Sequence, residues 1–443
     1  MNIIIAILIL GIVIAFHEFG HFIIAKSRGI TVREFSIGMG PKLFGFEKGG
    51  TQYCLRLLPI GGACVMGEDE AVGPEDVNAF NNKTVWERIA VVFAGPFFNF
   101  ILAFFFALIV IGIVGYDPAY VLSVKDYQPA KTQAGLQPGD IIKEFNGKKI
   151  HLGRELATEL LYRELDGNPI TIVYERTDSE GEKTEYTVEY KPEYVKNYML
   201  GFYYTTTEPN ADAVINSVIE DYPMEAAGLQ KGDIITSVDG NEMKNVGELA
   251  EYLAQNPPGE EAMTIGYLRN GIEDEVQIVP LFDSEGYSLG FTYNYNYNYR
   301  EKTNLFGVIK YSFYEVKYLI VSTIKGLGQM ITGNISANDI GGPLRIGAEI
   351  DNAIEESKND GILYVVLNLL NWCILLSANL GVMNLLPIPA LDGGRLLFMF
   401  LEVVRGKPIA KEKEGMVHMI GIILLMLLMV FVFFNDIRII FFK

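Results

Sequence analysis

Four long apolar segments constrain this chain more than any other feature of its sequence. They cover residues 2–25, 89–115, about 362–391 and about 416–435, and each is long enough to cross a bilayer. A hydrocarbon core of about 30 Å takes about 20 helical residues to span. Half of the residues are hydrophobic, which is at the upper end for soluble domains. The segments therefore predict a polytopic α-helical membrane protein with four transmembrane helices.

The first apolar segment is expected to be retained as a helix. It lacks a positively charged start and a small-residue cleavage site, and its interior holds His17, Glu18 and His21. These features argue against a secretory signal peptide.

Charge is distributed unevenly along the chain. The net charge is −18, and residues 116–362 contain 40 acidic but only 21 basic residues. Basic residues gather instead in the loops after the first and third apolar segments: Lys26, Arg28, Arg33, Lys42, Lys48, Arg56, Lys83 and Arg88, then Arg395, Arg405, Lys407, Lys411 and Lys413. The positive-inside rule makes both loops cytoplasmic and the acidic middle exported, with both termini outside. The acidic middle also argues against a nucleic-acid partner.

The acidic middle contains an internal repeat. Residues 134–142 read AGLQPGDII and residues 227–235 read AGLQKGDII, an offset of 93. Each copy continues into strand-like runs with an Asn-Gly or Asp-Gly turn, and a helix-like stretch lies between them. The pattern resembles that of bacterial PDZ domains, which implies two α+β PDZ-like domains able to take a peptide as an added strand. Spacers that bind nothing are the alternative.

Three further segments have recognisable patterns. Residues 291–299 alternate between tyrosine and asparagine after Thr292, which is typical of a strand. Residues 304–332 are predicted to be an amphipathic helix against the outer leaflet rather than a fifth span, because four charged residues interrupt them. Residues 30–66 are glycine-rich and strand-like, so a small membrane-associated β-hairpin is expected there.

The first apolar segment carries a metal-binding pattern, His17-Glu18-Phe19-Gly20-His21. Residues four apart lie on one face of a helix, so both imidazoles can reach one ion, and neutral imidazole suits Zn²⁺. Glu18 can then take a proton from water whose pKa zinc has lowered. A chance string is the alternative, but ionisable groups inside an apolar span are costly and usually functional.

A catalytic zinc site needs a third protein ligand, and Asp392 is the candidate. Pro387 and Pro389 are expected to end the third apolar helix just before it. On these residues alone, Asp392 could equally be the cap of a following helix. Topology favours ligation, since Asp392 and His21 each lie a few residues before a basic cytoplasmic loop and so at similar depth.

The two motifs together resemble the site-2 protease family. The pairing is His-Glu-x-x-His in the first span with Asn-x-x-Pro-x-Pro-x-Leu-Asp-Gly, here Asn384 to Gly393, in a late span. PDZ domains between the second and third spans resemble the bacterial RseP-type members. Further matches are Phe93-Ala94-Gly95-Pro96 with Asn99, Gly342-Pro343, and Pro59-Ile60-Gly61-Gly62.

The resemblance implies an intramembrane zinc metalloendopeptidase of regulated intramembrane proteolysis, in the bacterial inner (cytoplasmic) membrane. Zn²⁺ would be held by His17, His21 and Asp392, near the cytoplasmic side, with Glu18 as the catalytic base. Substrates would be single-pass membrane proteins, such as an anti-sigma factor or a signal peptide remnant. The implied substrate-positioning residues are Asn384, Pro387 and Pro389.

The resulting domain plan follows the chain in nine segments. These are a first transmembrane helix (1–26), a cytoplasmic loop with the hairpin (27–88), a second transmembrane helix (89–115), a first PDZ domain (116–206), a second PDZ domain (207–290), a strand and interfacial-helix region (291–361), a third transmembrane helix (362–391), a cytoplasmic loop (392–415), and a fourth transmembrane helix with the C-terminal tail (416–443).

Two other functions are compatible with parts of the pattern. One is a membrane-anchored PDZ scaffold with a structural or vestigial metal site, and the other is a zinc transporter. Glu18 argues against the first, because a structural site needs no general base. The exported repeats have no evident role in the second. The remaining histidines, His151 and His418, are interpreted as a surface residue and a packing or interfacial residue.

Overall fold

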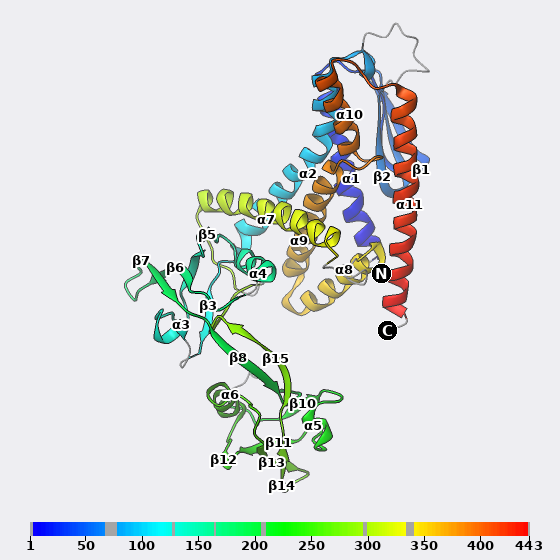
Figure 1. The fold of residues 1–443 in the computed structure, drawn as a ribbon. Helices are drawn as coiled ribbons and strands as arrows, with labels where there is room; N and C mark the ends of the chain where they lie inside the picture. Colours follow the sequence, from blue (N-terminus) through cyan, green and yellow to red (C-terminus); the bar gives the residue numbers. More distant parts are fainter. Residues whose placement is uncertain are drawn as a thin grey trace. The chain divides into compact units, whose positions relative to one another are not determined.

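The computed structural model describes residues 3–66, 78–125, 129–163, 165–204, 210–295, 299–333 and 341–441. The chain divides into two compact units (Figure 1). The helical unit comprises Met1–Tyr116 and Arg300–Lys443, and the β unit comprises Asp117–Tyr299.

Helices dominate the helical unit. They are α1 (Ile3–Ser27), α2 (Val85–Val114), α7 (Leu305–Ile331), α8 (Pro343–Ser357), α9 (Ile362–Leu385), α10 (Asp392–Arg405) and α11 (Lys411–Phe441), with 3-10 turns at Phe80–Asn82 and Lys358–Asp360. Within the described residues, four of them are long and apolar enough to cross a membrane: α1, α2, α9 and α11. The number of predicted spans is thus confirmed.

Glycine lets the first two long helices approach closely. A Cβ on Gly20 of α1 would lie 2.5 Å from the carbonyl oxygen of Ala94 on α2. On α9, a Cβ on Gly381 would lie 2.6 Å from the ring of Phe100. Small residues at such crossings are how helices pack in a membrane, where lipid removes the hydrophobic drive between them. The close crossing of α1 and α2 lies beside His17 and His21.

The chain between α9 and α11 differs from the prediction in one respect. The helix α9 ends at Leu385, as expected from the two prolines, and a turn follows. The predicted loop 392–415 is not all loop, because α10 covers Asp392–Arg405. Its apolar side chains Leu396 and Met399 are buried, and this packing outweighs the charge that suggested a loop. Asp392 is the first residue of α10, where a carboxylate also favours the helix N-terminus.

Two antiparallel strands, β1 (Val32–Lys48) and β2 (Thr51–Met66), follow α1. Gly49 and Gly50 form the turn with φ of 60° and 72°, values that favour glycine. At 17 and 16 residues the strands are longer than the small hairpin expected. Large apolar side chains of both strands are exposed: Met39, Leu43, Phe44, Phe46, Leu57 and Leu58.

Two similar four-stranded sheets form most of the β unit. Their strand orders are β5-β4-β6-β7 and β12-β11-β13-β14. The first copy contains β4 (Ile141–Phe145), β5 (Lys148–Lys149), α4 (Gly153–Tyr162), β6 (Ile170–Thr177) and β7 (Lys183–Tyr190). The second contains β11 (Ile234–Val238), β12 (Asn241–Glu242), α6 (Val246–Gln255), β13 (Met263–Arg269) and β14 (Ile272–Ile278). The offset of 93 residues seen in the sequence recurs in β4 and β11 and in α4 and α6, so the repeat is structural.

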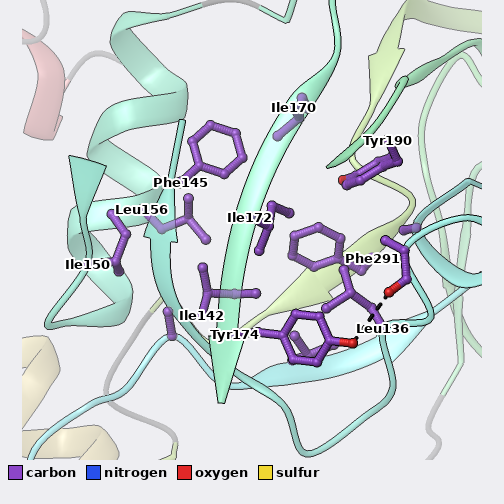
Figure 2. Packing of buried hydrophobic residues seen from close by; sticks show 14 residues of the cluster. Leu136, Ile142, Phe145, Ile150, Leu156, Ile170, Ile172, Tyr174, Tyr190 and Phe291 are labelled. Carbon is purple, nitrogen blue, oxygen red and sulfur yellow. Dashed lines mark hydrogen bonds between the residues drawn. The ribbon is translucent and has the colours of Figure 1, made fainter. Parts of the chain in front are cut away.

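The second copy is inserted into the first. The strands β8 (Glu193–Met199) and β15 (Leu281–Ser288) pair as the outgoing and returning chain, and β16 (Phe291–Tyr293) then pairs with β3 (Val121–Val124). Phe291 packs into the core of the first copy, as Figure 2 shows. The predicted domain boundary at residue 290 therefore separates the strand β16 from the hydrophobic core of the first copy, which Phe291 completes. Residues 296–298 of the alternating segment lie outside the described residues.

Short elements complete the β unit: α3 (Pro129–Thr132), α5 (Pro223–Ala226), β9 (Phe202–Tyr204) and β10 (Ile215–Val218). In the helical unit, α7 matches the predicted amphipathic helix. Its buried residues include Val316 and Leu319, while Phe306 and Ile331 are exposed. The helix α8 was not among the elements predicted from the sequence. The carboxylate of Asp436 on α11 accepts hydrogen bonds from the first turn of α8.

Candidate metal centre

Three side chains that the sequence singled out meet in the helical unit. His17 and His21 lie one turn apart on α1, and Asp392 begins α10. The Nε2 atoms of the two histidines are 3.2 Å apart, and Asp392 Oδ2 lies 3.1 Å and 3.3 Å from them. No other group of histidine, cysteine and carboxylate side chains in the described part of the chain converges in this way.

The spacing and the chemistry of these three atoms fit a zinc ion. Tetrahedral zinc with ligand bonds of about 2.0–2.1 Å separates its ligand atoms by about 3.3 Å. Asp392 Oδ2 is buried and makes no well-formed hydrogen bond with any described residue, although both imidazoles are near. Lone pairs gathered this closely repel one another unless a cation or proton lies between them. Nitrogen and carboxylate ligands are those that catalytic zinc takes.

A backbone carbonyl of α2 sets the protonation of one histidine. His21 Nδ1 lies 2.9 Å from the carbonyl oxygen of Val91. Since a carbonyl oxygen only accepts, Nδ1 must carry the hydrogen, and the lone pair is then on Nε2, which faces His17 and Asp392. Neutral His21 is thus prepared to bind a metal through Nε2.

Gly95 leaves the space in which both imidazoles lie. A Cβ at this position would overlap His21 Nε2 and would lie 2.8 Å from His17 Cε1. Gly95 is in the middle of α2, where glycine is otherwise unfavourable by about 1 kcal/mol. The sequence analysis noted it only as part of a family motif. An isolated glycine within an apolar helix was the available signal of a close approach.

The strand β2 holds the carboxylate of Glu18. Its Oε2 accepts a hydrogen bond from the backbone N–H of Cys64 at 3.0 Å. A Cβ on Gly62 would lie 3.0 Å from Glu18 Cγ, so β2 passes directly over this side chain. Burial raises the pKa of the Cys64 thiol to about 12, which keeps the thiol protonated near neutral pH.

The predicted substrate-positioning residues lie at the end of α9 and in the turn that precedes Asp392. Asn384 is in the last turn of α9, and Pro387 and Pro389 lie in the turn that leads to Asp392. The same turn contains Ala390, whose φ of 81° is unusual for a residue with a Cβ.

His418 contacts this turn. Its Nδ1 accepts a hydrogen bond from the backbone N–H of Ala390 at 2.9 Å. From the sequence, His418 was interpreted as a packing or interfacial residue, because nothing local in α11 indicates its partner. The other remaining histidine, His151, lies in the β unit, 3.3 Å from Glu155.

Comparison with known proteins identifies the family. The model of Peptidase family M50 matches residues 5–428. Zinc metalloprotease RasP of Geobacillus kaustophilus is 33% identical over 98% of this chain and 96% of that protein. Regulator of sigma-E protease RseP of Salmonella typhimurium is 30% identical over 97% of both chains. Regulator of sigma-W protease RasP of Bacillus subtilis is 28% identical over 98% of this chain and 97% of that protein.

A solved structure of the HtrA3 PDZ domain with a phage-derived ligand is 19% identical, covers 21% of this chain and 93% of that structure, and has a TM-score of 0.17. The family assignment does not depend on it. The assignment rests on a family match that spans α1 through most of α11 and on relatives that align over nearly their whole length. The chain belongs to Peptidase family M50 and is a zinc metalloprotease.

Proposed function

We propose that this protein is an intramembrane endopeptidase that hydrolyses peptide bonds within or near transmembrane segments of membrane proteins, as part of regulated intramembrane proteolysis. The observation that carries the proposal is the convergence of His17, His21 and Asp392, two of them from a helix long and apolar enough to cross a membrane. A metal site on an apolar, membrane-crossing helix would act on substrates that enter the membrane rather than on substrates confined to water.

Each of the converging residues has a distinct role in this proposal. His17, His21 and Asp392 hold Zn²⁺, which when bound polarises the scissile carbonyl and makes water more acidic. Glu18 takes a proton from the attacking water as its oxygen bonds to the carbonyl carbon. The C–N bond then breaks, and Glu18 passes the proton to the leaving amine. The hydrogen bond from Cys64 orients one oxygen of Glu18 and leaves the other for this transfer.

A substrate helix has to unwind before water can attack it. Backbone groups exposed in lipid are costly, so an enzyme strand has to replace the hydrogen bonds that the helix loses. We assign this role to β2, which passes over Glu18. The exposed apolar side chains of β1 and β2 support a hairpin associated with the membrane. Asn384, Pro387 and Pro389 would position the unwound segment.

The distribution of charge supports an orientation in the bacterial cytoplasmic membrane. The basic segments after α1 and α9 would be cytoplasmic, close to His21 and Asp392, and the acidic β unit would be exported. The amphipathic α7 would lie at the outer leaflet. Two relatives are named as regulators of sigma-E and sigma-W, which suggests single-pass substrates such as an anti-sigma factor. A signal peptide remnant would be a similar substrate.

The two repeats of the β unit are proposed to be PDZ domains that exclude substrates whose exported parts are still bulky. The structure suggests how to remove the whole unit cleanly, because the backbones of Tyr116 and Glu301 pair through two hydrogen bonds. Deleting residues 117–299 and joining the ends with a short Gly-Ser linker leaves that pair in place. If the deletion variant discriminates between intact and pre-trimmed substrates as well as the full chain does, the exclusion role is wrong.

The decisive experiment compares purified full-length protein with Glu18→Gln on a tagged single-span substrate in detergent, with zinc measured on both. Glu18→Gln keeps the shape of the side chain but removes the base. Glu47→Gln, an exposed position on β1, is the matched control. We expect the wild type and the control to cleave, and Glu18→Gln to hold zinc without cleaving. Zinc at full occupancy with no cleavage of any single-span substrate would favour the scaffold or transporter functions instead.

A further inference from the structure

Asn99 of α2 contacts Nδ1 of His17, whereas Nε2 of the same ring faces Asp392. Its side chain is fully buried, and its Nδ2 lies 3.2 Å from His17 Nδ1. The hydroxyl of Ser377 on α9 donates a hydrogen bond to the backbone carbonyl of Asn99 at 2.7 Å, which fixes the backbone there. Asn99 Oδ1 is buried and has no hydrogen-bond partner among the described residues. The oxygen and nitrogen of a carboxamide are told apart by their hydrogen bonds, so the contact with His17 alone does not fix which of the two atoms faces the imidazole.

The protonation of His17 conflicts with this orientation of the amide. If Nδ2 of Asn99 donates to His17 Nδ1, that nitrogen carries the lone pair and Nε2 carries the hydrogen. The hydrogen on Nε2 would then point toward His21 Nε2 and Asp392 Oδ2, at 3.2 Å and 3.1 Å. A protonated Nε2 cannot bind a metal. His21 is in the opposite state, because the carbonyl of Val91 requires hydrogen on its Nδ1.

A half-turn of the Asn99 carboxamide removes the conflict. It exchanges Oδ1 and Nδ2 without moving any other atom. Oδ1 then accepts from His17 Nδ1–H, so the lone pair of Nε2 faces the other two ligand atoms. Both histidines would then be held alike, each by an oxygen acceptor that α2 supplies.

We propose that Asn99 is a positioning residue that accepts a hydrogen bond from His17 Nδ1–H and so keeps His17 in the tautomer that binds zinc. The inference rests on the proposed metal site and names a residue that acts through His17 rather than on the substrate. Acceptors of this kind around zinc-bound histidines typically strengthen metal binding by 10- to 100-fold.

Two substitutions separate the acceptor role from packing. Asn99→Leu has a similar shape but cannot accept a hydrogen bond, whereas Asn99→Asp keeps the shape and, when ionised, can only accept. The control is Asn379→Leu, which removes another partly buried amide of the helical unit, one whose Oδ1 accepts a hydrogen bond from Thr323 rather than from a histidine. The measurement is zinc retention by the full-length protein in detergent against a graded chelator, together with the visible spectrum of the Co²⁺-loaded protein.

We expect Asn99→Leu to lose zinc affinity by roughly 10- to 100-fold and to change the Co²⁺ spectrum. Asn99→Asp and Asn379→Leu are expected to stay within about threefold of the wild type. If Asn99→Asp fails as badly as Asn99→Leu, the amide acts as a donor or only fills space, and the inference is wrong. Unchanged zinc retention in Asn99→Leu would contradict it equally.

Folding and the metal site itself are controlled separately. Thermal unfolding of the zinc-free variants shows whether a substitution destabilises the folded protein. If Asn99→Leu does not fold, Asn99→Ala also lacks the acceptor and takes its place beside Asn99→Asp. A wild-type protein that retains no zinc would overturn the proposed metal site together with this inference, whereas normal wild-type retention with unaffected variants would overturn the inference alone.

Discussion

His418 Nδ1 accepts a hydrogen bond from the backbone N–H of Ala390 at 2.9 Å, and this bond links α11 to the turn that ends at Asp392. Ala390 has a φ of 81°, a conformation that costs a residue with a Cβ on the order of 1 kcal/mol. A Cβ on Gly421 of α11 would overlap the carbonyl oxygen of Pro389, so the helix touches the turn at a second point. The helix α11 thus contacts the turn at two points.

Replacing His418 with leucine should weaken this support. The partly buried N–H of Ala390 would lose its acceptor, which costs about 1 kcal/mol, so kcat/KM for a single-span substrate should fall roughly tenfold. Asn Oδ1 can take the place of Nδ1, so His418→Asn should recover most of the activity. Met419→Ala, at an exposed neighbouring position, is the control. Equal activity of His418→Leu and the wild type would show that the turn needs no help from α11.

Adding one methyl group at Gly95 should destroy the metal site. The Cβ of Gly95→Ala would overlap His21 Nε2, and the rigid helices α1 and α2 cannot move apart at their glycine-mediated crossing. We expect zinc retention to fall at least about 100-fold, measured as bound zinc after gel filtration. Gly112→Ala is the matched control, because its Cβ would meet only Val308, at 3.9 Å. Full zinc occupancy in Gly95→Ala would mean that the histidines bind metal in another arrangement.

Asp436 should anchor α8 to α11. It is fully buried and accepts hydrogen bonds from the backbone N–H groups of Gly342, Leu344 and Arg345 at 2.9, 3.1 and 3.2 Å. A carboxylate at a helix N-terminus satisfies free donors and the helix dipole together. Asp436→Ala should therefore speed hydrogen exchange in the first turns of α8 by about 10- to 100-fold.

Phe434→Ala, at an exposed position of the same helix, should leave the exchange of α8 unchanged. If both substitutions speed exchange in α8 to the same extent, α11 stabilises α8 by general packing, and the carboxylate has no special role.

The second repeat of the β unit should lose an ion pair in acid. Hydrogen bonds from Arg269, at 2.6 and 2.7 Å, hold the pKa of Asp233 below its usual range. The pKa of Asp233 is lower in the folded state than the unfolded value of about 3.9, so the ion pair stabilises the fold fully at pH values above about 3.9. This stabilisation is lost as the pH falls through the folded-state pKa. Asp233→Asn should thus cost about 1–3 kcal/mol at pH 7, and this difference should shrink below about pH 4.

Hydrogen exchange of the β11–β14 amides in the full-length protein, corrected for intrinsic rates, measures this difference. Glu273→Gln, at an exposed position on β14, serves as the control. A cost of Asp233→Asn that is the same at pH 3 and pH 7 would rule out the ion pair as its source. The first repeat has the equivalent pair, Arg176 with Asp140 at 2.7 Å, 93 residues earlier.

The predictions made from the sequence succeed where the governing pattern is local. Four apolar segments correspond to four helices, the two prolines end α9 at Leu385, and the repeat appears as two similar sheets. The zinc metalloprotease family is confirmed by the comparisons. The roles of individual residues at the metal site remain predictions, which the variants above test.

The predictions fail where a residue packs against, or forms a hydrogen bond with, a residue that is distant in the chain. The sequence analysis placed a boundary before Phe291, because nothing near it shows that its ring packs in the first repeat's core. It described residues 392–415 as a loop, although burial of Leu396 and Met399 stabilises α10. His418 was set aside for the same reason, since its partner is a backbone N–H of a different segment.

The sequence by itself determined which side chains of the first helix could bind a metal and that this helix is long enough to cross a bilayer. A spacing of four residues puts His17 and His21 on one helix face whatever the rest of the chain does, and the length of an apolar segment follows from bilayer thickness. Only the tertiary structure decided that Asp392 reaches the same point, that Gly95 leaves room for the imidazoles, and that Val91 and Asn99 contact their outer nitrogens. Those contacts depend on how α1, α2, α9 and α10 cross. Helix crossing is set by close packing between distant residues, which no local pattern in the sequence records.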